Sequence, residues 1–413
     1  MQQAQILHRE GRLDDARTLC EELLRDDPGR FEALSMLALI AAQRGDFERA
    51  IASYDRAIAI NPGFADGYSN RGASFAALNR VIDALANFDR AIAIDPGHAE
   101  AHVGRAIVWL LQGDFTRGWR EFEWRWKTPQ GRAMQAHKGI SQPLWLGAED
   151  LAGKTILLHS EKGLGDTLQF CRLAKCVRDL GATVLLQVQG PLVEILEPLD
   201  GVSRVVADTQ PSPSFDLHCP LLSLPLALKI ELSRIPTGTY LRAPPASVAR
   251  WRAKLGEPSK PRIGLVWRGD SSNAIDHARS LTLVQLLSLL PDRYRYVSLQ
   301  KDLNEPEQRI VAAHSLDFSL SQDLNFTETA ALCECLDLVI SVDTSVAHLS
   351  AALGQKTWIL LPFNADCRWL LDRSESPWYP SATLYRQASR GDWRGVLDRV
   401  AADLNRDFAS RLG

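Results

Sequence analysis

The spacing of small and large apolar residues sets the first third of the chain apart. Small residues recur every 34 positions, at Ala16, Ala50, Ala84 and Gly118. Larger side chains follow four residues later in the same frame, at Cys20, Tyr54, Phe88 and Phe122. A small residue lets two helices approach closely, and a large side chain four positions on lies on the same helical face. This spacing predicts helices stacked in pairs.

Prolines in the same frame mark where each pair of helices ends. They stand 34 residues apart, at Pro28, Pro62 and Pro96. Proline cannot continue a helical hydrogen-bond ladder, so each of them breaks the second helix of a pair. The frame divides this part of the chain into the end of an early unit, two complete copies and a degenerate last one: 1–30, 31–64, 65–98 and 99–130.

This pattern resembles the tetratricopeptide repeat (TPR), a helix–turn–helix unit with the same 34-residue period. TPR arrays are concave solenoids that usually hold peptides or other proteins. The resemblance therefore implies a protein partner on the concave surface. Polar residues suited to this groove are Asn70, Arg71, Asn79 and Arg105. Periodicity alone does not separate groove ligands from ordinary solvated side chains.

The last repeat carries an aromatic face. Trp119, Phe122 and Trp126 stand at positions i, i+3 and i+7 and would share one side of a helix. A terminal repeat ordinarily presents a polar outer face instead. We therefore expect this face to be covered by the residues that follow it, as a buried joint between domains. The alternative is an exposed aromatic platform for a ligand.

After residues 127–152 the pattern changes to short apolar runs that alternate with helical stretches. In the first series, strands are predicted at 155–159, 183–188, 202–206 and 215–218, and one helix at 164–180. A linker at 256–261 precedes the second series. Its predicted strands are 263–267, 296–299, 338–342 and 357–361, and its helices 281–290, 327–335, 345–353 and 393–404. Such alternation favours two parallel, Rossmann-like halves, with a cleft where the carboxyl ends of their strands face each other.

Composition and charge narrow the class of protein. The 413 residues are 46% hydrophobic and carry a net charge of −3, so neither a nucleic-acid surface nor a polybasic membrane anchor is expected. No apolar run approaches the roughly 18 residues of a spanning helix, and the first residues do not form a secretory signal. Seven scattered cysteines without zinc-ligand spacing are interpreted as reduced packing residues. We therefore expect a cytoplasmic protein without a metal site.

The first segment suited to chemistry joins the strand at 155–159 to the next helix. Gly163 and Gly165, beside Lys162, allow a tight turn that presents bare N–H groups at a helix N-terminus. Asp166 would then lie at the mouth of the cleft. Because Gly-Leu-Gly-Asp is not a complete dinucleotide fingerprint, the alternative is that Asp166 only caps the helix.

A second segment follows the buried strand at 338–342. Asp343 can accept from sugar or ribose hydroxyls. Thr344 and Ser345 place hydroxyls and free N–H groups at the positive end of a helix dipole, an arrangement that favours phosphate. The alternative is that Thr344 and Ser345 only cap this helix and that His348 is an ordinary half-buried histidine.

Two loops of the second half complete the candidates. Arg268 and Arg279 lie in a long strand-to-helix loop and could neutralise a phosphate, unless the loop is simply solvated. The segment 361–379 is aromatic and charged, and it includes Asp366 and Arg368. It suits base stacking or cleft closure, and equally packing under a long loop.

Residues 153–405 resemble the GT-B glycosyltransferases of the bacterial heptosyltransferase type, family 9. In that family a Gly-Asp turn follows the first strand, here Gly165 and Asp166, and a late strand ends in Asp-Thr-x-x-x-His, here from Asp343 to His348. The stretches 157–166 and 360–379 look closer still to bacterial TPR-fused glycosyltransferases, some of which modify flagellin. With the repeats included, the resemblance covers nearly the whole chain.

The resemblance implies a role for each matching residue. Asp166 corresponds to the general base, and Asp343 with Thr344 and its neighbours corresponds to the donor-binding segment. Arg279 is the best match to the basic residue that contacts the donor phosphate. The implied co-substrate is a nucleotide sugar, without a further cofactor or metal. The first half is shorter than the acceptor domain typical of the family, which favours a protein acceptor over a lipopolysaccharide core.

The sequence thus predicts an α + α/β chain in which a TPR solenoid precedes a two-lobed GT-B domain. Its expected parts are about three and a half repeats, a linker, an acceptor lobe and a donor lobe with a closing helix: 1–128, 129–152, 153–255 and 256–413. The expected activity is inverting, metal-independent transfer of a sugar to a hydroxyl, such as Ser or Thr of a flagellin-like protein docked by the TPR arm. The alternatives are a non-catalytic scaffold with a vestigial transferase fold, a heptosyltransferase-like enzyme acting on lipopolysaccharide or another glycan, a nucleotide-sugar epimerase, and O-GlcNAc-transferase-like chemistry.

Overall fold

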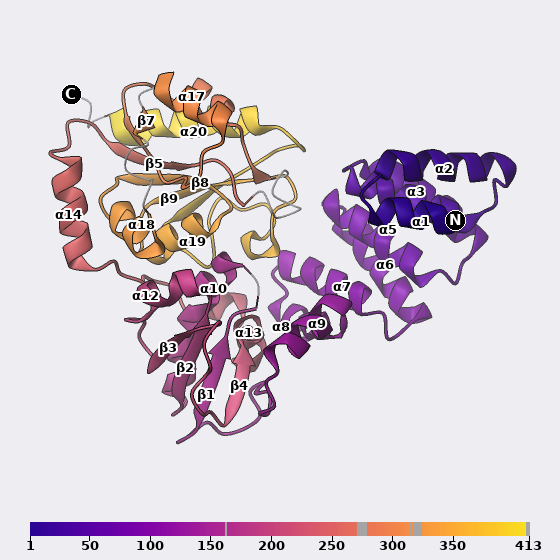
Figure 1. Cartoon of the computed structure of the whole chain (residues 1–413), viewed down its shortest axis with the longest axis horizontal. Helices are drawn as coiled ribbons and strands as arrows, with labels where there is room; N and C mark the ends of the chain where they lie inside the picture. Colours follow the sequence, from indigo (N-terminus) through magenta and orange to yellow (C-terminus); the bar gives the residue numbers. More distant parts are fainter. Residues whose placement is uncertain (162, 271–278, 314–315, 318–323, 410–413) are drawn as a thin grey trace. The chain divides into compact units, whose positions relative to one another are not determined.

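The computed structural model describes residues 1–161, 163–270, 279–313, 316–317 and 324–409. The chain forms two compact units, Met1–Gly139 and Ile140–Gly413, which are described separately (Figure 1). The first unit is helical, and the second contains two parallel sheets. The predicted order of helical repeats followed by an α/β part is therefore confirmed.

The helices of the first unit follow the predicted frame. They are α1 (Gln2–Arg9), α2 (Leu13–Asp26), α3 (Phe31–Gln43), α4 (Phe47–Ile60), α5 (Ala65–Ala77), α6 (Val81–Ile94), α7 (Ala99–Leu111) and α8 (Phe115–Phe122). Consecutive helices pack in pairs, and each pair stacks on the next (Figure 1). The helices α3, α5 and α7 begin 34 residues apart, as the repeat requires.

The turns between successive pairs share one chemistry. The side-chain oxygens of Asp27, Asn61 and Asp95 accept the N–H of the glycine two residues later, at 3.1, 3.2 and 2.8 Å. A side chain of this type stabilises a turn by bonding to the backbone just after itself. The intervening proline prevents the preceding helix from continuing. Each second helix therefore ends where the proline spacing predicts.

Small residues and aromatic rings interlock inside the repeats. Ala50 and Ala84 are fully buried, as are the rings of Tyr54 and Phe88. A Cβ at Gly104 would lie 2.5 Å from Phe88 Cε1, so only glycine lets α7 pass so close to this ring. The close approach buries the apolar face that a single repeat cannot bury alone.

The end of the first unit departs from the prediction. The helix α8 stops at Phe122 and is followed by the 3-10 turn η1 (Glu123–Lys127), so Trp126 does not continue a helical face with Trp119. Trp119 and Phe122 are buried, and neither belongs to an exposed aromatic platform. Trp124 stacks on His102, with the ring centroids 3.6 Å apart.

The segment predicted as a linker, 129–152, belongs to the folded units. The helix α9 (Pro129–Lys138) begins with a proline, and the Thr128 hydroxyl caps it by accepting the N–H of Gly131 at 3.1 Å. The residues after Gly139 are part of the second unit, where Trp145 is buried and donates its backbone N–H to the carbonyl of His218 at 2.8 Å. The pattern missed α9 because this helix carries few apolar residues.

The first lobe of the second unit is built on a four-stranded parallel sheet. In spatial order β3-β2-β1-β4, its strands are β3 (Arg204–Ala207), β2 (Thr183–Val188), β1 (Thr155–His159) and β4 (Leu217–Pro220). The helix predicted at 164–180 is divided into α10 (Leu164–Phe170), η2 (Cys171–Leu173) and α11 (Ala174–Asp179). The remaining short helices are η3 (Gly190–Leu192), α12 (Val193–Leu196), η4 (Leu221–Ser223), α13 (Leu224–Ala227) and η5 (Leu232–Arg234).

The second lobe contains a six-stranded parallel sheet in the order β10-β9-β8-β5-β6-β7. Its strands are β5 (Arg262–Val266), β6 (Arg295–Ser298), β7 (Leu316–Asp317), β8 (Leu338–Val342), β9 (Thr357–Leu361) and β10 (Ala382–Arg386). The strands β5, β8 and β9 are buried at every residue, which explains their continuous apolar runs. The edge strands β7 and β10 were not predicted because they lack such runs.

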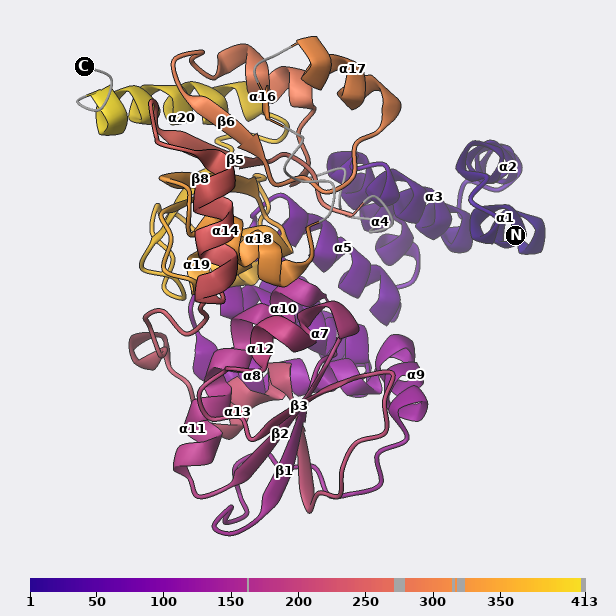
Figure 2. The ribbon, with the colours of Figure 1, turned by 60° about the vertical axis from the view of Figure 1, so that its left-hand side comes forward.

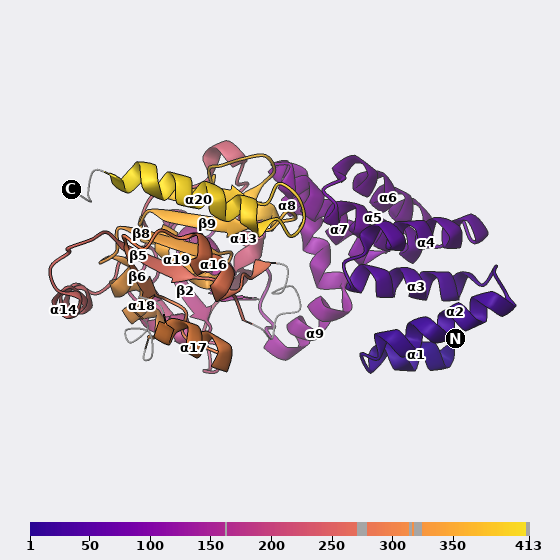
Figure 3. The ribbon, with the colours of Figure 1, turned by 90° about the horizontal axis from the view of Figure 1, so that it is seen from above.

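Helices cover both faces of this sheet. They are α16 (Leu283–Leu289), α17 (Glu305–Ala313), α18 (Phe326–Cys333), α19 (Ser345–Ala352) and α20 (Trp393–Phe408). Figures 2 and 3 show α16 and α20 on one face and α18 and α19 on the other. The buried side of α20 packs with sheet residues such as Trp358 and Leu360 in one apolar core. The predicted closing helix is therefore confirmed.

The helix α14 (Pro245–Leu255) moves the predicted boundary between the lobes. It packs on α18, where the Glu328 carboxylate accepts from Trp251 Nε1 at 2.8 Å and from the Ser247 hydroxyl at 2.9 Å. These contacts place α14 with the second lobe, whereas the sequence assigned it to the first. The boundary error arises because the linker motif at 256–261 is only the turn into β5.

The two lobes contact each other directly. The helix α10, which follows β1, packs against α19, which follows β8. Nearby, the buried Arg172 lies between the rings of Tyr240 and Tyr379, 4.4 Å from each centroid. The guanidinium also donates to the Tyr240 hydroxyl at 2.9 Å. Along the α10–α19 contact the lobes are therefore packed together, at the place where the sequence predicted a cleft.

Within the described ranges, no helix is both long enough and apolar enough to cross a membrane. The same residues contain no group of three or more His, Cys, Asp or Glu side chains arranged for a metal ion. The cysteines, all of which lie within these ranges, do not form disulfides, and four of them are buried: Cys20, Cys171, Cys219 and Cys333.

Candidate functional site

Asp166 closes the first turn of α10 and also reaches the other lobe. Its Oδ2 accepts the N–H of Gly163, the residue before the helix, at 3.1 Å. Its Oδ1 accepts from Arg368 Nη2 at 2.6 Å. The capping alternative is thus correct for one oxygen, while the second oxygen faces the segment after β9. Lys162, predicted beside this turn, lies outside the described residues.

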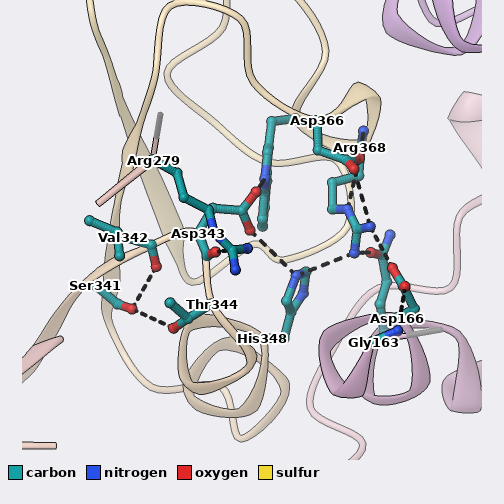
Figure 4. A network of polar contacts seen from close by, with 12 residues as sticks. Gly163, Asp166, Arg279, Ser341, Val342, Asp343, Thr344, His348, Asp366 and Arg368 are labelled. Atoms are coloured by element: carbon teal, nitrogen blue, oxygen red, sulfur yellow. Dashed lines mark hydrogen bonds and ion pairs between the residues drawn. The ribbon is translucent and has the colours of Figure 1, made fainter. Parts of the chain in front are cut away.

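The N-terminus of α19 begins directly after the buried strand β8. Thr344 precedes the helix, but its hydroxyl lies 3.0 Å from the Ser341 hydroxyl and does not cap the helix (Figure 4). Ser345 is the first helical residue and is partly exposed. The interpretation that Thr344 serves only as a side-chain cap is therefore wrong. Because Thr344 does not cap this helix, the first N–H groups keep their capacity for an anion.

Asp343 is anchored at this N-terminus through both its backbone and its side chain. Its carbonyl accepts from Arg279 Nη1 at 2.7 Å, and its Oδ2 accepts from Trp369 Nε1 at 2.9 Å. Its Oδ1 lies 3.7 Å from His348 Nε2. Burial raises the pKa of Asp343 above its ordinary value, against the opposing effect of the Arg368 charge. The structure therefore brings together Asp343, Arg279 and His348, three residues of the predicted donor site.

His348 is fully buried and holds one tautomer. Its Nε2 lies 3.3 Å from Arg368 Nη1, and its Nδ1 lies 2.9 Å from the Tyr379 hydroxyl. An arginine can only donate, so Nε2 accepts and the neutral ring carries its proton on Nδ1, which donates to Tyr379. Burial, followed by the nearby Arg368 charge, lowers the pKa of His348 well below its ordinary value. His348 is therefore a neutral acceptor at the lobe contact.

Arg368 joins the two predicted segments (Figure 4). Besides Asp166 it donates to Gln169 Oε1 at 2.8 Å, which is the second contact with α10. It also donates to Asp366 Oδ1 at 2.9 Å and approaches His348 on α19. A single guanidinium thereby connects the Gly-Asp turn of the first lobe with the Asp-Thr segment of the second.

Gly165 has a packing role that differs from the predicted one. A Cβ at this position would lie 2.7 Å from His348 Cδ2, closer than side chains pack. The glycine therefore allows α10 to meet α19. The sequence pattern predicts instead that Gly165 presents bare backbone N–H groups to a ligand.

Arg268 has partners that differ from the predicted phosphate. Its Nε donates to the Glu307 carboxylate at 3.0 Å, and Trp267 Nε1 donates to the same carboxylate at 2.6 Å. Burial opposes the charge of Glu307, but the hydrogen bonds from Arg268, Trp267 and the Asn304 backbone, together with the Arg268 charge, outweigh it and lower the pKa of the carboxyl. Arg268 thus ties the end of β5 to α17, and of the two predicted phosphate ligands Arg279 alone contacts the segment around Asp343.

The two arginines predicted for the TPR groove are tied into the repeats. Arg71 pairs with Asp55 and donates to Asn87 Oδ1 at 2.8 Å. Arg105, one repeat later, pairs with Asp89 at 2.7 Å and also with Glu121. These contacts link neighbouring helices, so both arginines stabilise the stack. Asn70 is the exposed member of the predicted groove set.

Sequence reasoning missed the central role of Arg368 and of its neighbours. The segment 361–379 was noted as charged and aromatic, and Trp369 and Tyr379 are indeed buried against His348. No sequence signal showed that Arg368 would reach α10, which lies about 200 positions earlier in the chain. Arg172 carried no recognisable motif at all.

Two family models match this chain. The tetratricopeptide repeat model matches residues 1–63 and 70–118. The model of glycosyltransferase family 9 (heptosyltransferase) matches residues 297–360, which include the segment from Asp343 to His348. The chain thus carries tetratricopeptide repeats followed by a domain that matches glycosyltransferase family 9, and both predicted resemblances are confirmed.

A curated relative spans most of the chain. The protein FlbA of Caulobacter vibrioides is 26% identical over an alignment of 404 positions, which covers 91% of this chain and 67% of FlbA. Among solved structures, MamA is similar with a TM-score of 0.29 and 22% identity, over 33% of this chain and 80% of MamA. A thermophilic TPR protein of Thermus thermophilus has a TM-score of 0.30 and 24% identity, over 31% of this chain and 72% of its own.

Proposed function

We propose that this chain is a glycosyltransferase that moves a sugar from a nucleotide-sugar donor to a hydroxyl group, and that the acceptor is a Ser or Thr of a protein held by the TPR unit. The reaction inverts the anomeric centre and needs no metal ion. The observation that carries the proposal is the junction at Arg368. It brings Asp166 of the first lobe beside the Asp343–His348 segment of the second.

The donor site of this proposal is the N-terminus of α19. Uncapped N–H groups and the positive end of the helix dipole stabilise a diphosphate. Arg279, held on the Asp343 carbonyl, adds a positive charge beside them. The neutral His348 borders the same place, and its Nε2 accepts from Arg368.

The proton acceptor of the proposal is Asp166. The acceptor oxygen attacks the anomeric carbon and its proton moves to the carboxylate, while the bond from sugar to phosphate breaks and the nucleoside diphosphate leaves. Each carboxylate oxygen has two lone pairs, so the bonds to Gly163 and Arg368 leave room for the incoming proton. The helix dipole and Arg279 stabilise the charge on the leaving group.

The TPR unit supplies the acceptor protein in this proposal. Solenoids of this type hold peptides and proteins, and docking raises the local concentration of the reacting Ser or Thr. The reaction would take place in the cytoplasm, where nucleotide sugars are made. A flagellin-like protein is the acceptor that the resemblance suggests.

The proposal is tested by replacing Asp166 with Asn. Purified chains are incubated with UDP-, GDP-, ADP- and CMP-sugars, and slow transfer of the sugar to water or to an added peptide is followed. We expect Asp166→Asn to slow the reaction by roughly 10²–10⁴-fold, because the amide cannot take a proton. The matched control is Asp398→Asn on the exposed side of α20, which should leave the rate unchanged. Equal rates for Asp166→Asn and the wild type would remove the assigned base.

A non-catalytic scaffold is the second candidate, and one observation favours it. Both oxygens of Asp166 are engaged by the protein itself, which is also what a purely structural carboxylate would show. A scaffold with a vestigial fold would bind none of the nucleotide sugars in a thermal-shift panel. Binding without any turnover in the wild type would favour it too.

A further inference from the structure

We propose that Arg368 binds the donor diphosphate and that the Asp366 carboxylate holds the place of a phosphate group until the donor arrives. This inference rests on the function proposed above. Arg368 is then the residue that recognises the diphosphate at the lobe contact, and Asp366 is the side chain that the phosphate displaces. Both residues lie outside the segment that matches the family model, residues 297–360.

The hydrogen bonds of Arg368 use every donor that the side chain has. A guanidinium carries five N–H groups, one on Nε and two on each Nη. Nη1 contacts Gln169 and His348, Nη2 contacts Asp166 and Asp366, and Nε contacts Asp366. A ligand can therefore bind Arg368 only by displacing one of these four partners.

Asp366 is the partner that can leave. The side chains of Asp166 and His348 are 14% and 3% exposed, and Gln169 is fully buried. The Asp366 side chain is 42% exposed and comes from the same short loop as Arg368. Turning it into solvent breaks its bond to the Arg368 backbone N–H, but among the described residues its hydrogen bonds go to Arg368 and none to another helix or strand of either lobe.

The geometry of the Asp366 contact is that of an anion on an arginine fork. Its two oxygens meet the Nε–Nη2 edge, at 2.9 Å for Oδ1 and 3.4 Å for Oδ2. This edge binds carboxylate and phosphate in the same bidentate manner. A phosphate of the donor can thus take both positions, while Nη1 stays on Gln169 and His348.

A further feature is consistent with a ligand at this site. The Nε2 of Gln169 is buried and has no acceptor among the described residues, although its Oε1 holds Arg368. A buried donor of this kind is costly unless a ligand or water meets it.

The exchange gives Arg368 a defined place in the proposed reaction. With a phosphate on its Nε–Nη2 edge and Asp166 on its other Nη2 hydrogen, one guanidinium touches both the leaving group and the base. Arg368 therefore positions the two groups that act on opposite sides of the transferred sugar.

The test measures the binding of nucleoside diphosphates to the full chain. UDP, GDP, ADP and CDP are titrated calorimetrically into the wild type, Asp366→Asn, Arg368→Gln and the remote control Asp398→Asn. Asparagine keeps the oxygen that accepts the Arg368 backbone N–H at 3.0 Å, so Asp366→Asn preserves the loop. We expect the nucleotide that binds the wild type to bind Asp366→Asn at least fivefold more tightly and Arg368→Gln at least tenfold more weakly.

The outcomes separate the inference from the function on which it rests. If one nucleotide binds the wild type but its affinity is the same in Asp366→Asn and in Asp398→Asn, the exchange is refuted and the donor site stands. If no nucleotide binds the wild type, the proposed function fails and this inference with it. Should Arg368→Gln not fold, the gain in Asp366→Asn over Asp398→Asn decides alone.

Discussion

Arg368, Gly165 and His348 meet where the two lobes of the second unit touch, and each constrains the others. The guanidinium needs its partners on α10 and α19, and the glycine lets those two helices come close enough to share it. His348 remains neutral in this contact because it is buried beside a permanent positive charge. At the scale of residues, the geometry of the site therefore depends on close helix packing as much as on hydrogen bonds and charge.

The close approach at Gly165 predicts the effect of adding one methyl group. In Gly165→Ala the new Cβ would lie 2.7 Å from His348 Cδ2, so the helices must move apart. We expect the free energy of unfolding to fall by about 1–3 kcal/mol, as in other overpacked interiors. Urea denaturation measures this change, and Gly190→Ala is the control, because nothing lies within 4 Å of a Cβ there. An equal loss in both variants would contradict the packing role.

The burial of His348 predicts how stability depends on pH. Its pKa in the folded protein is lowered, while the unfolded chain has the ordinary value of about 6.5, so the unfolded state takes up a proton first as the pH falls. Stability is therefore full above about pH 6.5 and declines below it, by about 1.4 kcal/mol per pH unit for one such group. Denaturation curves between about pH 5 and 8 should show a shallower decline in His348→Gln. The exposed His137→Gln should follow the wild type.

At the scale of elements, repeated contacts explain both units. In the first unit each helix pair reuses the same Asx turn and the same small-residue contact. In the second, a buried parallel strand is followed each time by a helix whose N-terminus lies at the same edge of the sheet. This arrangement puts α10 after β1 and α19 after β8, the two elements that carry Asp166 and Asp343–His348.

The stacking of the repeats predicts a large effect at Phe88. Its ring fills the space under Gly72 and Gly104, so Phe88→Ala leaves a cavity between α5, α6 and α7. We expect the first unit to lose about 3–5 kcal/mol of unfolding free energy. The control is Ile82→Ala on the outer side of α6, where the side chain is 80% exposed. Hydrogen exchange of the helical amides measures both, and similar protection in the two variants would contradict this account.

At the scale of the whole molecule, the two lobes of the second unit form one compact unit and share a buried cation. Arg172 from the first lobe lies between Tyr240 and Tyr379, and Tyr379 in turn holds His348. The site and the contact between the lobes are therefore continuous. Opening of the lobes would have to break this stack as well as the bonds of Arg368.

The shared cation predicts that Arg172 controls the coupling of the lobes. Arg172→Met keeps much of the apolar volume but leaves the Trp378 carbonyl and the Tyr240 hydroxyl without their donor. We expect a loss of at least about 1–3 kcal/mol and a wider range of lobe separations in small-angle scattering. Arg178→Met, on the exposed side of α11, is the matched control. An unchanged scattering profile in Arg172→Met would show that the lobes are held by other contacts.

Much of the architecture follows from the sequence, because it depends on local rules. The 34-residue period, the proline turns and the strands at 155–159, 183–188, 338–342 and 357–361 agree with the structure residue by residue or nearly so. Buried parallel strands and repeated helix pairs can be recognised in a sequence from the periodicity of its apolar residues. The elements that were missed, such as α9 and β10, carry too few apolar residues to produce such a signal.

The sequence by itself determined which segments end at a functional edge, since a strand followed by glycines or by Asp-Thr defines a helix N-terminus wherever the chain folds. Only the tertiary structure decided which side chains meet there. It placed Arg368 on Asp166, turned Arg268 toward Glu307 and made Gly165 a packing residue. The physical reason is that hydrogen bonds and close contacts depend on distance in space, which local periodicity does not encode.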